Sequence, residues 1–252
     1  MAEKWNITLR LHREKTGQQP YFQEFKMEAN PDENVIDLVE RVWAFHDRSL
    51  TYAHACHHST CGACGMRVNG TEKLTCITPV RSVVSDGGTL TVEPLRNFPV
   101  VSDLVVDMGD LYRRMALVGH APVHSDLQEA IQPDFRPAGP TRPGEDFLRL
   151  ADCIECGLCI SACPVAGSTS DYLGPAPLAG AHQAGLAGRS DLLAWVDSAD
   201  GVWRCHSAFE CTAVCPSNVD PAWRIMELRK QVVGARIRGL FKSKKGAAEV
   251  AK

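Results

Sequence analysis

The first thirty residues alternate between apolar and polar side chains, with a polar break near Gly17. Apolar residues stand at every second position from Trp5 to Leu11, and the alternation resumes from Tyr21 to Ala29. A period of two is typical of a strand that buries one of its faces. The pattern therefore predicts two strands that form a hairpin.

The period becomes helical after the break at Asn30-Pro31. Apolar residues recur at spacings of three and four between Val35 and Val42. Asn34 precedes this run as a cap, and Asp37 lies in the favourable first turn. Strand, strand and helix are the opening of a β-grasp domain.

Turn residues mark the remaining strands of this first domain. Asn69-Gly70 is the strongest short hairpin signal, and the run Leu74 to Ile77 that follows it predicts a strand that carries Cys76. Thr89 to Val92 predicts the last strand, so that the domain closes near Pro94. We expect one sheet covered by one helix.

The second half of the chain has helical patterns separated by prolines and glycines. A linker from Leu95 to Met108 leads into a helical run from Gly109 to Gly119. Five prolines between His120 and Gly144 then exclude an uninterrupted helix or strand. This stretch is interpreted as an ordered crossover, with a flexible linker as the alternative. The prolines and glycine of Gly174 to Pro177 predict irregular chain.

Three helices are predicted in the last third of the chain. Two of them extend over Leu178 to Ala187 and Asp191 to Val196. The third starts at Asp220-Pro221, with aspartate as the cap and proline at the first helical position, and ends near Gly234. The second half is therefore expected to be helical.

Eleven cysteines change this picture, because their number is odd and their spacing is tight. Both properties argue against a disulfide framework and favour thiolates that hold metal in a reducing compartment. The N-terminus lacks the apolar run of a secretory signal and the Arg- and Ser-rich character of a transit peptide. We therefore expect a bacterial-type cytoplasm.

The first cysteine group has the C-x4-C-x2-C spacing of a plant-type 2Fe-2S site. Its predicted ligands are Cys56, Cys61, Cys64 and Cys76. Gly62, Ala63 and Gly65 are small, so backbone N–H groups can approach inorganic sulfides. Thiolate-held zinc is one alternative. A Rieske-type site is another alternative, because His57 and His58 follow Cys56. The second Cys-x-His pair of that pattern is absent, so the two histidines are interpreted as surface groups or neighbours of the ligands.

The second cysteine group starts with a C-x2-C-x2-C-x3-C-P run from Cys153 to Pro164, a bacterial ferredoxin pattern whose fourth cysteine ligates the other cluster of a pair. The partner run ends at Cys215-Pro216 and has Ala208 in place of its second cysteine. Crossing the fourth cysteines predicts a four-thiolate site for a 4Fe-4S cluster, made of Cys153, Cys156, Cys159 and Cys215. It predicts a three-thiolate site for a 3Fe-4S cluster, made of Cys163, Cys205 and Cys211. A pair of zinc sites is the alternative, although zinc needs neither two Cys-Pro endings nor interleaved ligands.

These patterns together predict an α+β protein of two domains. Residues 1–108 are expected to form a 2Fe-2S β-grasp domain of the plant-type ferredoxin kind, with its connector. Residues 109–252 are expected to form an all-α, bacterial-ferredoxin-like domain that carries the 4Fe-4S and 3Fe-4S clusters. The second domain would depend on its clusters more than on a large apolar core.

Charge and hydropathy limit the partners. The net charge of -3 over 252 residues gives no indication of a nucleic-acid partner. No run approaches the roughly 18 to 20 apolar residues that cross a bilayer. The segment from Arg229 to Lys245 is basic and could lie beside anionic headgroups. A solvated, partly disordered end is the alternative for the last ten residues.

The order of these motifs resembles the iron-sulfur subunit family of succinate dehydrogenase and fumarate reductase. The resemblance is carried by the plant-type cysteine loop, the connector from Asn97 to Met108, the run from Cys153 to Pro164, and the segment from Trp203 to His206. It covers nearly the whole chain. Three such motifs in this order are far more specific than any one alone.

The resemblance implies a subunit of a membrane-bound succinate:quinone oxidoreductase, an enzyme of the respiratory chain. A flavoprotein partner that carries FAD would oxidise succinate, and this chain would relay the electrons through its 2Fe-2S, 4Fe-4S and 3Fe-4S clusters to quinone. The chain has no G-x-G-x-x-G fingerprint, so the substrate site is expected on the partner. Membrane anchor subunits would hold the chain on the cytoplasmic face of the bacterial plasma membrane.

The quinone end departs from the family pattern. Pro164 is kept, and His206 matches the family's histidine beside the 3Fe-4S cluster and quinone, so both are candidates for this end. Gly167 and Ser168 stand near the positions of a tryptophan pair in better-known members. A quinone pocket that lies mainly in the anchor chains is therefore an alternative. For His206 the alternative role is a hydrogen bond to a cluster sulfide or to solvent.

Three other functions stay open on the sequence. The same subunit could serve a quinol:fumarate reductase, because the direction depends on cluster potentials and on the quinone. It could be the iron-sulfur arm of another flavin dehydrogenase, such as one for glycolate or heterodisulfide. From a different class comes a zinc-stabilised interaction module without a redox role.

Overall fold

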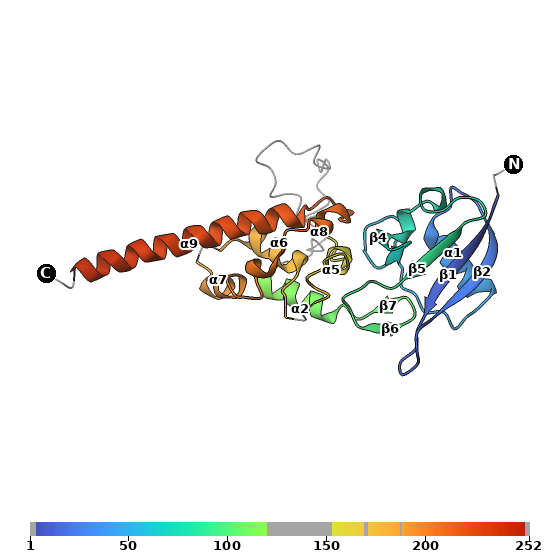
Figure 1. The fold of residues 1–252 in the computed structure, drawn as a ribbon, viewed down its shortest axis with the longest axis horizontal. Helices are drawn as coiled ribbons and strands as arrows, with labels where there is room; N and C mark the ends of the chain where they lie inside the picture. The colour runs from blue at the N-terminus through green and yellow to red at the C-terminus, as the bar shows by residue number, and fades with distance from the viewer. Residues whose placement is uncertain (1–3, 120–152, 169–170, 187, 250–252) are drawn as a thin grey trace, which may run out of the picture.

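The computed structural model describes residues 4–119, 153–168, 171–186 and 188–249 (Figure 1). For residues 239–249 only the backbone is described. The crossover expected between His120 and Gly144 lies outside the described residues. In Figure 1 the strands gather at one end of the molecule and the helices of the second half at the other.

The N-terminal half is a five-stranded sheet with one long helix. Its strands follow the spatial order β2-β1-β5-β3-β4, in which β1 and β5 are parallel and the other pairs are antiparallel. The elements are β1 (Trp5–Arg13), β2 (Tyr21–Ala29), α1 (Val35–Phe45), β3 (Gly65–Val68), β4 (Thr71–Leu74), η1 (Thr75–Ile77), η2 (Val80–Ser82) and β5 (Thr89–Glu93).

One apolar core holds this half together. The inward positions of β1 and β5 and the buried face of α1 belong to a single cluster, which includes Leu9, Val39 and Leu90 without exposed area. The expected cap of α1 is present, since the backbone N–H of Asn34 donates to the carboxylate of Asp37 at 2.8 Å. The alternation and the helical period therefore predicted these elements correctly.

The β3–β4 hairpin forms at the expected dipeptide but ends sooner than expected. Asn69 and Gly70 both have positive φ, 49° and 83°, as a type I′ turn requires. Cys76 does not lie on a strand, because β4 ends at Leu74 opposite Gly65 and the chain then turns into η1. Beyond Gly65 the opposite chain is the cysteine loop, so no ladder partner continues the strand.

The connector contains a small sheet that the sequence patterns did not indicate. Strands β6 (Val100–Ser102) and β7 (Val105–Val106) pair around a turn at Asp103, whose φ is +47°. The Asp103 carboxylate is fully buried and accepts hydrogen bonds from Arg13 Nε at 3.2 Å and from Lys15 Nζ at 2.7 Å. The connector is thus fixed to the first strand and its turn.

The C-terminal half is helical and contains two very short helices. Its elements are α2 (Gly109–Val118), α5 (Leu158–Ser161), α6 (Pro175–Ala184), α7 (Ser190–Val196), η3 (Val202–Arg204), α8 (Glu210–Ala213) and α9 (Pro221–Glu249). Helices α6 and α9 pack together, and Leu178, Ile225 and Leu228 are completely buried between them. Helix α2 ends at a left-handed Gly119, as expected.

Helix boundaries in this half differ from the sequence expectations at three places. Pro175 to Pro177 begin α6 instead of forming irregular chain, because the first turn of a helix leaves its N–H groups without helical partners and tolerates proline. The same helix stops at Ala184, before a Gly185 with φ +74°. Helix α9 continues past Gly234 to Glu249 and extends away from the other helices (Figure 1), since one glycine costs only about 1 kcal/mol in a helix.

The two halves are in direct contact. Leu158 of α5 is buried in the core of the N-terminal half. Ser161 Oγ donates to Glu72 Oε1 at 2.8 Å, and the Asn97 amide donates to the carbonyl oxygens of Ile160 and Cys163 at 2.7 and 3.0 Å. The connector and β4 therefore position the cysteine run that follows residue 153.

Candidate metal centres

The first group of cysteines lies on the loop between α1 and β3 and on η1. Cys64 and Cys76 are buried on either side of the Gly65–Leu74 pair, where Thr75 donates to the carbonyl of Cys64 through its backbone N–H at 3.1 Å and its hydroxyl at 2.9 Å. Burial raises the pKa of Cys76 to about 12, helped by a hydrogen bond that its thiol donates to Cys64 and by the nearby sulfurs of Cys64 and Cys56. Cys56, Cys64 and Cys76, three of the four predicted ligands, are therefore neighbours.

Cys61, the fourth predicted ligand, lies beside Cys56. The sulfur of Cys56 accepts hydrogen bonds from the backbone N–H groups of His58, Thr60 and Cys61 at 3.5, 3.3 and 3.4 Å. The hydrogen bond from His58 is the largest cause that lowers the pKa of Cys56 to about 6, and Cys61 adds a further one from its side chain. The loop therefore favours a thiolate, which is the form that ligates metal. Left-handed φ values at His57, Ser59 and Gly62 wrap the chain around this sulfur.

Four cysteines from two distant runs line one cavity in the C-terminal half. They are Cys153, Cys156, Cys159 and Cys215. Its apolar wall includes Ala176, Ala179 and Val219, and the backbone N–H of Val219 donates to Cys215 Sγ at 3.4 Å. Burial is the main cause that raises the pKa of Cys156 to about 12, and the thiols of Cys153 and Cys215 contribute. The cavity thus brings together the four residues that the crossed pattern groups.

The remaining three cysteines line a second cavity. They are Cys163, Cys205 and Cys211. Burial and the neighbouring thiols of Cys163 and Cys205 raise the pKa of Cys211 to about 12. Ala208 belongs to the wall of this cavity, and so do Pro164 and His206. The fourth corner is therefore lined by a methyl group, as the sequence pattern indicates.

A tyrosine that sequence reasoning missed completes the three-thiol cavity. Tyr172 is only 2 % exposed, lines the cavity, and has a hydroxyl without a hydrogen-bond partner in the structure. Burial is the largest cause that raises its pKa, and the sulfur of Cys205 is the next. A buried donor of this kind needs an acceptor, and a cluster sulfide would supply one. No pattern marks this residue in the sequence, because it stands alone in irregular chain.

Arg229 also takes part in this region, although the sequence placed it in a basic tail. Its guanidinium donates to the carbonyl oxygens of Val202, at 2.9 Å, and of Cys205. Arg236, farther along α9, pairs with Asp197 at 2.6 Å. These two positive charges therefore serve internal contacts that hold the Cys205 segment and α7 against α9.

The three groups of thiols are adjacent in space. A Cβ added to Gly62 of the first loop would lie 2.8 Å from Cys156 Cβ, so the 2Fe-2S loop touches the four-thiol loop. Helices α5 and α8 are in contact, and the thiol of Cys211 contributes to the raised pKa of Cys159, so the two cavities are neighbours as well. The order along the molecule is the first loop, the four-thiol cavity and the three-thiol cavity.

The residues present fit iron-sulfur clusters. All predicted ligands are thiols, sulfurs in each of the three groups accept backbone N–H hydrogen bonds, and the walls of the cavities are largely apolar. Hydrogen bonds to ligand sulfurs and exclusion of water are the means by which proteins tune such clusters. The fold and the sites thus define an electron-carrying iron-sulfur protein.

Comparison with known proteins agrees with this class. Residues 7–113 match the family described as a 2Fe-2S iron-sulfur cluster binding domain, and residues 149–219 match the 4Fe-4S dicluster domain. The fumarate reductase iron-sulfur subunit of Mycobacterium tuberculosis (strain CDC 1551 / Oshkosh) is 34% identical over 91% of this chain and 93% of its own length. That of Haemophilus influenzae is 30% identical over 86% and 88%.

A solved structure has the same fold. A chain of the Mycobacterium smegmatis Sdh1 complex in the apo form superposes with a TM-score of 0.75 at 24% identity, over 93% of this chain and 98% of that chain. The chain belongs to the family of iron-sulfur subunits of succinate dehydrogenases and fumarate reductases. The family matches favour iron-sulfur clusters over the zinc alternative. Among the described residues, no helix combines the length and apolar character needed to cross a membrane.

Proposed function

We propose that this chain is the electron-transfer subunit of a membrane-bound succinate dehydrogenase, with a plant-type β-grasp domain and a bacterial-ferredoxin-like domain divided near residue 108. The supporting observation is the unbroken row of three thiol groups, from the loop of Gly62 through Cys156 to the cavity of Cys163. Clusters held there would supply one-electron redox chemistry. The chain contributes thiolates, buried walls and close contact between successive sites.

The proposed ligand sets follow the three groups. Cys56, Cys61, Cys64 and Cys76 hold a 2Fe-2S cluster; Cys153, Cys156, Cys159 and Cys215 hold a 4Fe-4S cluster; and Cys163, Cys205 and Cys211 hold a 3Fe-4S cluster. The support for the last set is the methyl group of Ala208 in its wall, because it offers no ligand for a fourth iron.

The exposure of the two ends of the row supports our proposal for the partners. The loop of Cys56 and Cys61 would face a flavoprotein subunit with FAD, since it lies at one end of the row and Cys61 is exposed, whereas every other cysteine is buried or partly buried. At the other end, Pro164 and His206 are exposed at the three-thiol cavity and would face quinone. Exposed Trp203 and Phe209 beside them offer an apolar surface for anchor subunits in the plasma membrane, with this chain on its cytoplasmic side.

A quinol:fumarate reductase is the second candidate. It is favoured by the names of the relatives from Mycobacterium tuberculosis and Haemophilus influenzae, both fumarate reductase subunits. The same residues would serve either direction, because the direction depends on the potentials of the clusters and of the quinone. Succinate oxidation and fumarate reduction are therefore measured in the same membranes.

The test is low-temperature EPR on membranes that contain the complex. We expect a 3Fe-4S signal in the air-oxidised sample that disappears when succinate is added, while a 2Fe-2S signal grows. Clusters that only dithionite reduces would remove succinate as the donor. Faster quinol-dependent fumarate reduction than succinate oxidation would favour the second candidate.

Ala208→Cys tests the three-thiolate assignment. A fourth thiol at this corner should convert the site to a 4Fe-4S cluster, so the oxidised 3Fe-4S signal disappears while the other signals stay. Ala213→Cys, on the short helix α8 that follows Ala208, is the control, since Ala213 is exposed and does not line the cavity. A 3Fe-4S signal of unchanged intensity in a folded Ala208→Cys complex would contradict the assignment.

His206→Ala tests the quinone end. We expect slower succinate-to-quinone turnover with unchanged reduction of an artificial acceptor that takes electrons from the flavoprotein. Unchanged quinone turnover would leave His206 with a hydrogen bond to a cluster sulfide or to solvent as its role.

A further inference from the structure

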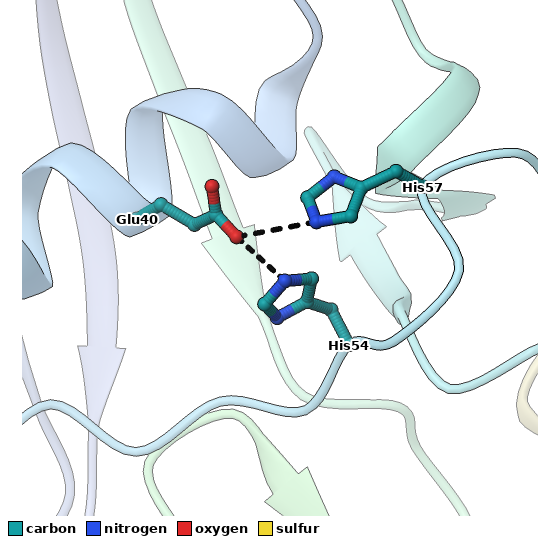
Figure 2. Close-up of side chains that lie close together, drawn as sticks. All are labelled: Glu40, His54 and His57. Atoms are coloured by element: carbon teal, nitrogen blue, oxygen red, sulfur yellow. Dashed lines mark ion pairs between the residues drawn. The ribbon is translucent and has the colours of Figure 1, made fainter.

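Two histidines and a glutamate meet beside the first cysteine loop without serving the thiol sites. Glu40 projects from α1, and His54 and His57 come from the loop that leads to Cys56 and past it (Figure 2). His54 Nε2 lies 2.6 Å and His57 Nε2 lies 3.6 Å from the same oxygen, Glu40 Oε1. Figure 2 shows both rings turned toward this carboxylate.

The spacing of these atoms suits a small cation. One ligand atom from each residue can be chosen so that all three lie within 4.8 Å of one another. Zinc bonds to imidazole nitrogen and carboxylate oxygen are about 2.0 to 2.2 Å long, so tetrahedral ligands are about 3.3 Å apart. Small side-chain rotations would therefore bring the three groups to bonding distance.

Neighbouring rings hold the cluster in this arrangement. Tyr52 stacks on His54, with ring centroids 5.5 Å apart and an interplanar angle of 16°, and Trp43 contacts Tyr52 edge to face at 6.4 Å. His54 and His57 themselves meet edge to face at 4.4 Å. Ligands whose rings are fixed before binding lose less conformational entropy when a metal arrives.

The cluster is also accessible. The side chains of Glu40, His54 and His57 are 32%, 25% and 46% exposed, so a hydrated cation can reach them and keep a water ligand. Two histidines and one carboxylate with an open fourth position form a known zinc-binding set. This set contains no thiolate, the soft ligand type that holds iron-sulfur clusters, so it suits a different metal from the cysteine groups.

We propose that Glu40, His54 and His57 bind a zinc-type divalent cation that ties the first cysteine loop to helix α1. The site is separate from the proposed electron-transfer function and stands on its own geometry. Bound metal would replace the hydrogen bond between His54 and Glu40 with three bonds. It would thereby order the segment from 54 to 61, which carries Cys56 and Cys61.

Equilibrium dialysis of the full, cluster-loaded chain against zinc, without its partner subunits, tests the proposal. The wild-type chain should take up one zinc at this site, and Glu40→Gln and His54→Gln should bind that zinc at least about 10-fold more weakly. His58→Ala is the matched control, because His58 is an exposed histidine of the same loop outside the cluster. It should bind zinc as the wild type does.

Zinc X-ray absorption of the same samples identifies the ligands. We expect nitrogen and oxygen neighbours with imidazole scattering. Zinc should slow hydrogen exchange across residues 54–61 in the wild type and in His58→Ala, but not in Glu40→Gln or His54→Gln. Sulfur neighbours at about 2.3 Å would mean that zinc had entered a thiol site, and would overturn the proposal. Equal zinc uptake by the wild type and Glu40→Gln, or no uptake by the wild type, would overturn it as well.

Discussion

The two halves of the molecule differ in what holds them together. The N-terminal sheet and α1 share one continuous apolar core, and the buried Asp103 fixes the connector to Arg13. In the C-terminal half, α5 and α8 have four residues each, far below the length at which a helix is stable alone. Both short helices carry or adjoin proposed ligands. We therefore expect burial to stabilise the N-terminal half and α6 with α9, and ligation to stabilise the short helices α5 and α8.

Removal of the clusters should have the largest effect on stability of the changes proposed. It should destabilise the short helices of the C-terminal half and leave the N-terminal sheet folded. Without metal, the segments around Cys153 to Pro164 and Cys205 to Pro216 lose the bonds that fix them, and structural metal sites contribute on the order of 10 kcal/mol to folding. We expect loss of hydrogen-exchange protection in α5 and α8 after chelation and reduction, while β1 and β5 stay protected.

Two outcomes of the same experiment would contradict this difference between the halves. If β1 and β5 lose protection together with α5, the two halves form one cooperative unit through Leu158 and the Ser161–Glu72 hydrogen bond. If α5 and α8 stay protected without metal, ligation is not what holds them.

Asp103→Asn should destabilise the N-terminal half by about 3 kcal/mol, because it removes one of the two carboxylates that pair with the buried Arg13 and leaves only Asp47. Thr51 and Glu14 also donate backbone N–H groups to this carboxylate, at 2.8 and 3.0 Å. Denaturant unfolding followed by exchange in β1 measures the effect. Asp86→Asn, at an exposed carboxylate that accepts one hydrogen bond from the backbone of residue 6, is the control and should cost under about 1 kcal/mol. Equal losses in the two variants would contradict the role of the buried network.

The same carboxylate predicts a pH dependence. Burial acts to raise the pKa of Asp103, but hydrogen bonds from Lys15, from two backbone N–H groups and from Arg13 outweigh it, so its pKa is lowered in the folded protein. Its contribution is therefore fully present above the unfolded value of about 4 and is lost as the pH falls toward the folded value. The wild type should lose stability below about pH 4 more steeply than Asp103→Asn, and parallel curves would refute this account.

Gly62→Ala should weaken the contact between the halves by about 1 to 3 kcal/mol through overpacking. The added Cβ would meet Cys156 Cβ at 2.8 Å and the carbonyl of Ile154 at 3.0 Å. The matched control is Gly17→Ala, which has a similar φ of +79° but nothing within 4 Å, so it carries the backbone strain alone. The measurement is the denaturant midpoint at which visible cluster absorbance disappears. Identical midpoints in the two variants would show that the Gly62 contact is unimportant.

Tyr172→Phe should have the smallest effect and concerns only the three-thiol site. A hydrogen bond from the hydroxyl to a sulfide of the proposed 3Fe-4S cluster would stabilise the reduced form, so its loss should lower the midpoint potential of that cluster. A net contribution of about 1 kcal/mol corresponds to roughly 40 mV for one electron. Redox titration followed by EPR measures this, with Tyr21→Phe on the exposed β2 strand as the control. An unchanged potential would assign the Tyr172 hydroxyl a different acceptor.

Local patterns predicted the elements that local rules decide. The alternation from Trp5 to Leu11, the cap at Asn34 and the Asn69-Gly70 turn each specify backbone geometry within a few residues, and each expected element is present. The expectation failed for Cys76, because the end of β4 depends on where its partner strand begins. It also failed for Pro175, because proline breaks a helix interior but not a first turn.

The site residues also fall into those that local spacing predicted and those that only the tertiary fold brings together. Cysteine spacing grouped the four thiols of one cavity and the three of the other, since the crossed pairing is encoded in the two Cys-Pro runs. Tyr172 and the pair of Glu40 and His54 could not be predicted, because they meet their neighbours only through the tertiary fold. The contact between Gly62 and Cys156 could not be predicted either, because it forms only in the tertiary fold. The sequence indicated only that a small residue suits the Gly62 position.

The crossed grouping of the cysteines has a consequence for biogenesis. Cys159 and Cys163 are synthesised almost together but line different cavities, and neither cavity is complete until Cys211 and Cys215 have been added. At about 5 to 20 residues per second, the ribosome needs roughly 3 to 10 s to extend the chain from Cys163 to Cys215. A nascent chain therefore exposes unpaired thiols during this interval, and any fragment that ends before Cys211 lacks thiols from both cavities. With the proposed ligand sets, both clusters could be completed only after Cys211 and Cys215 had been translated.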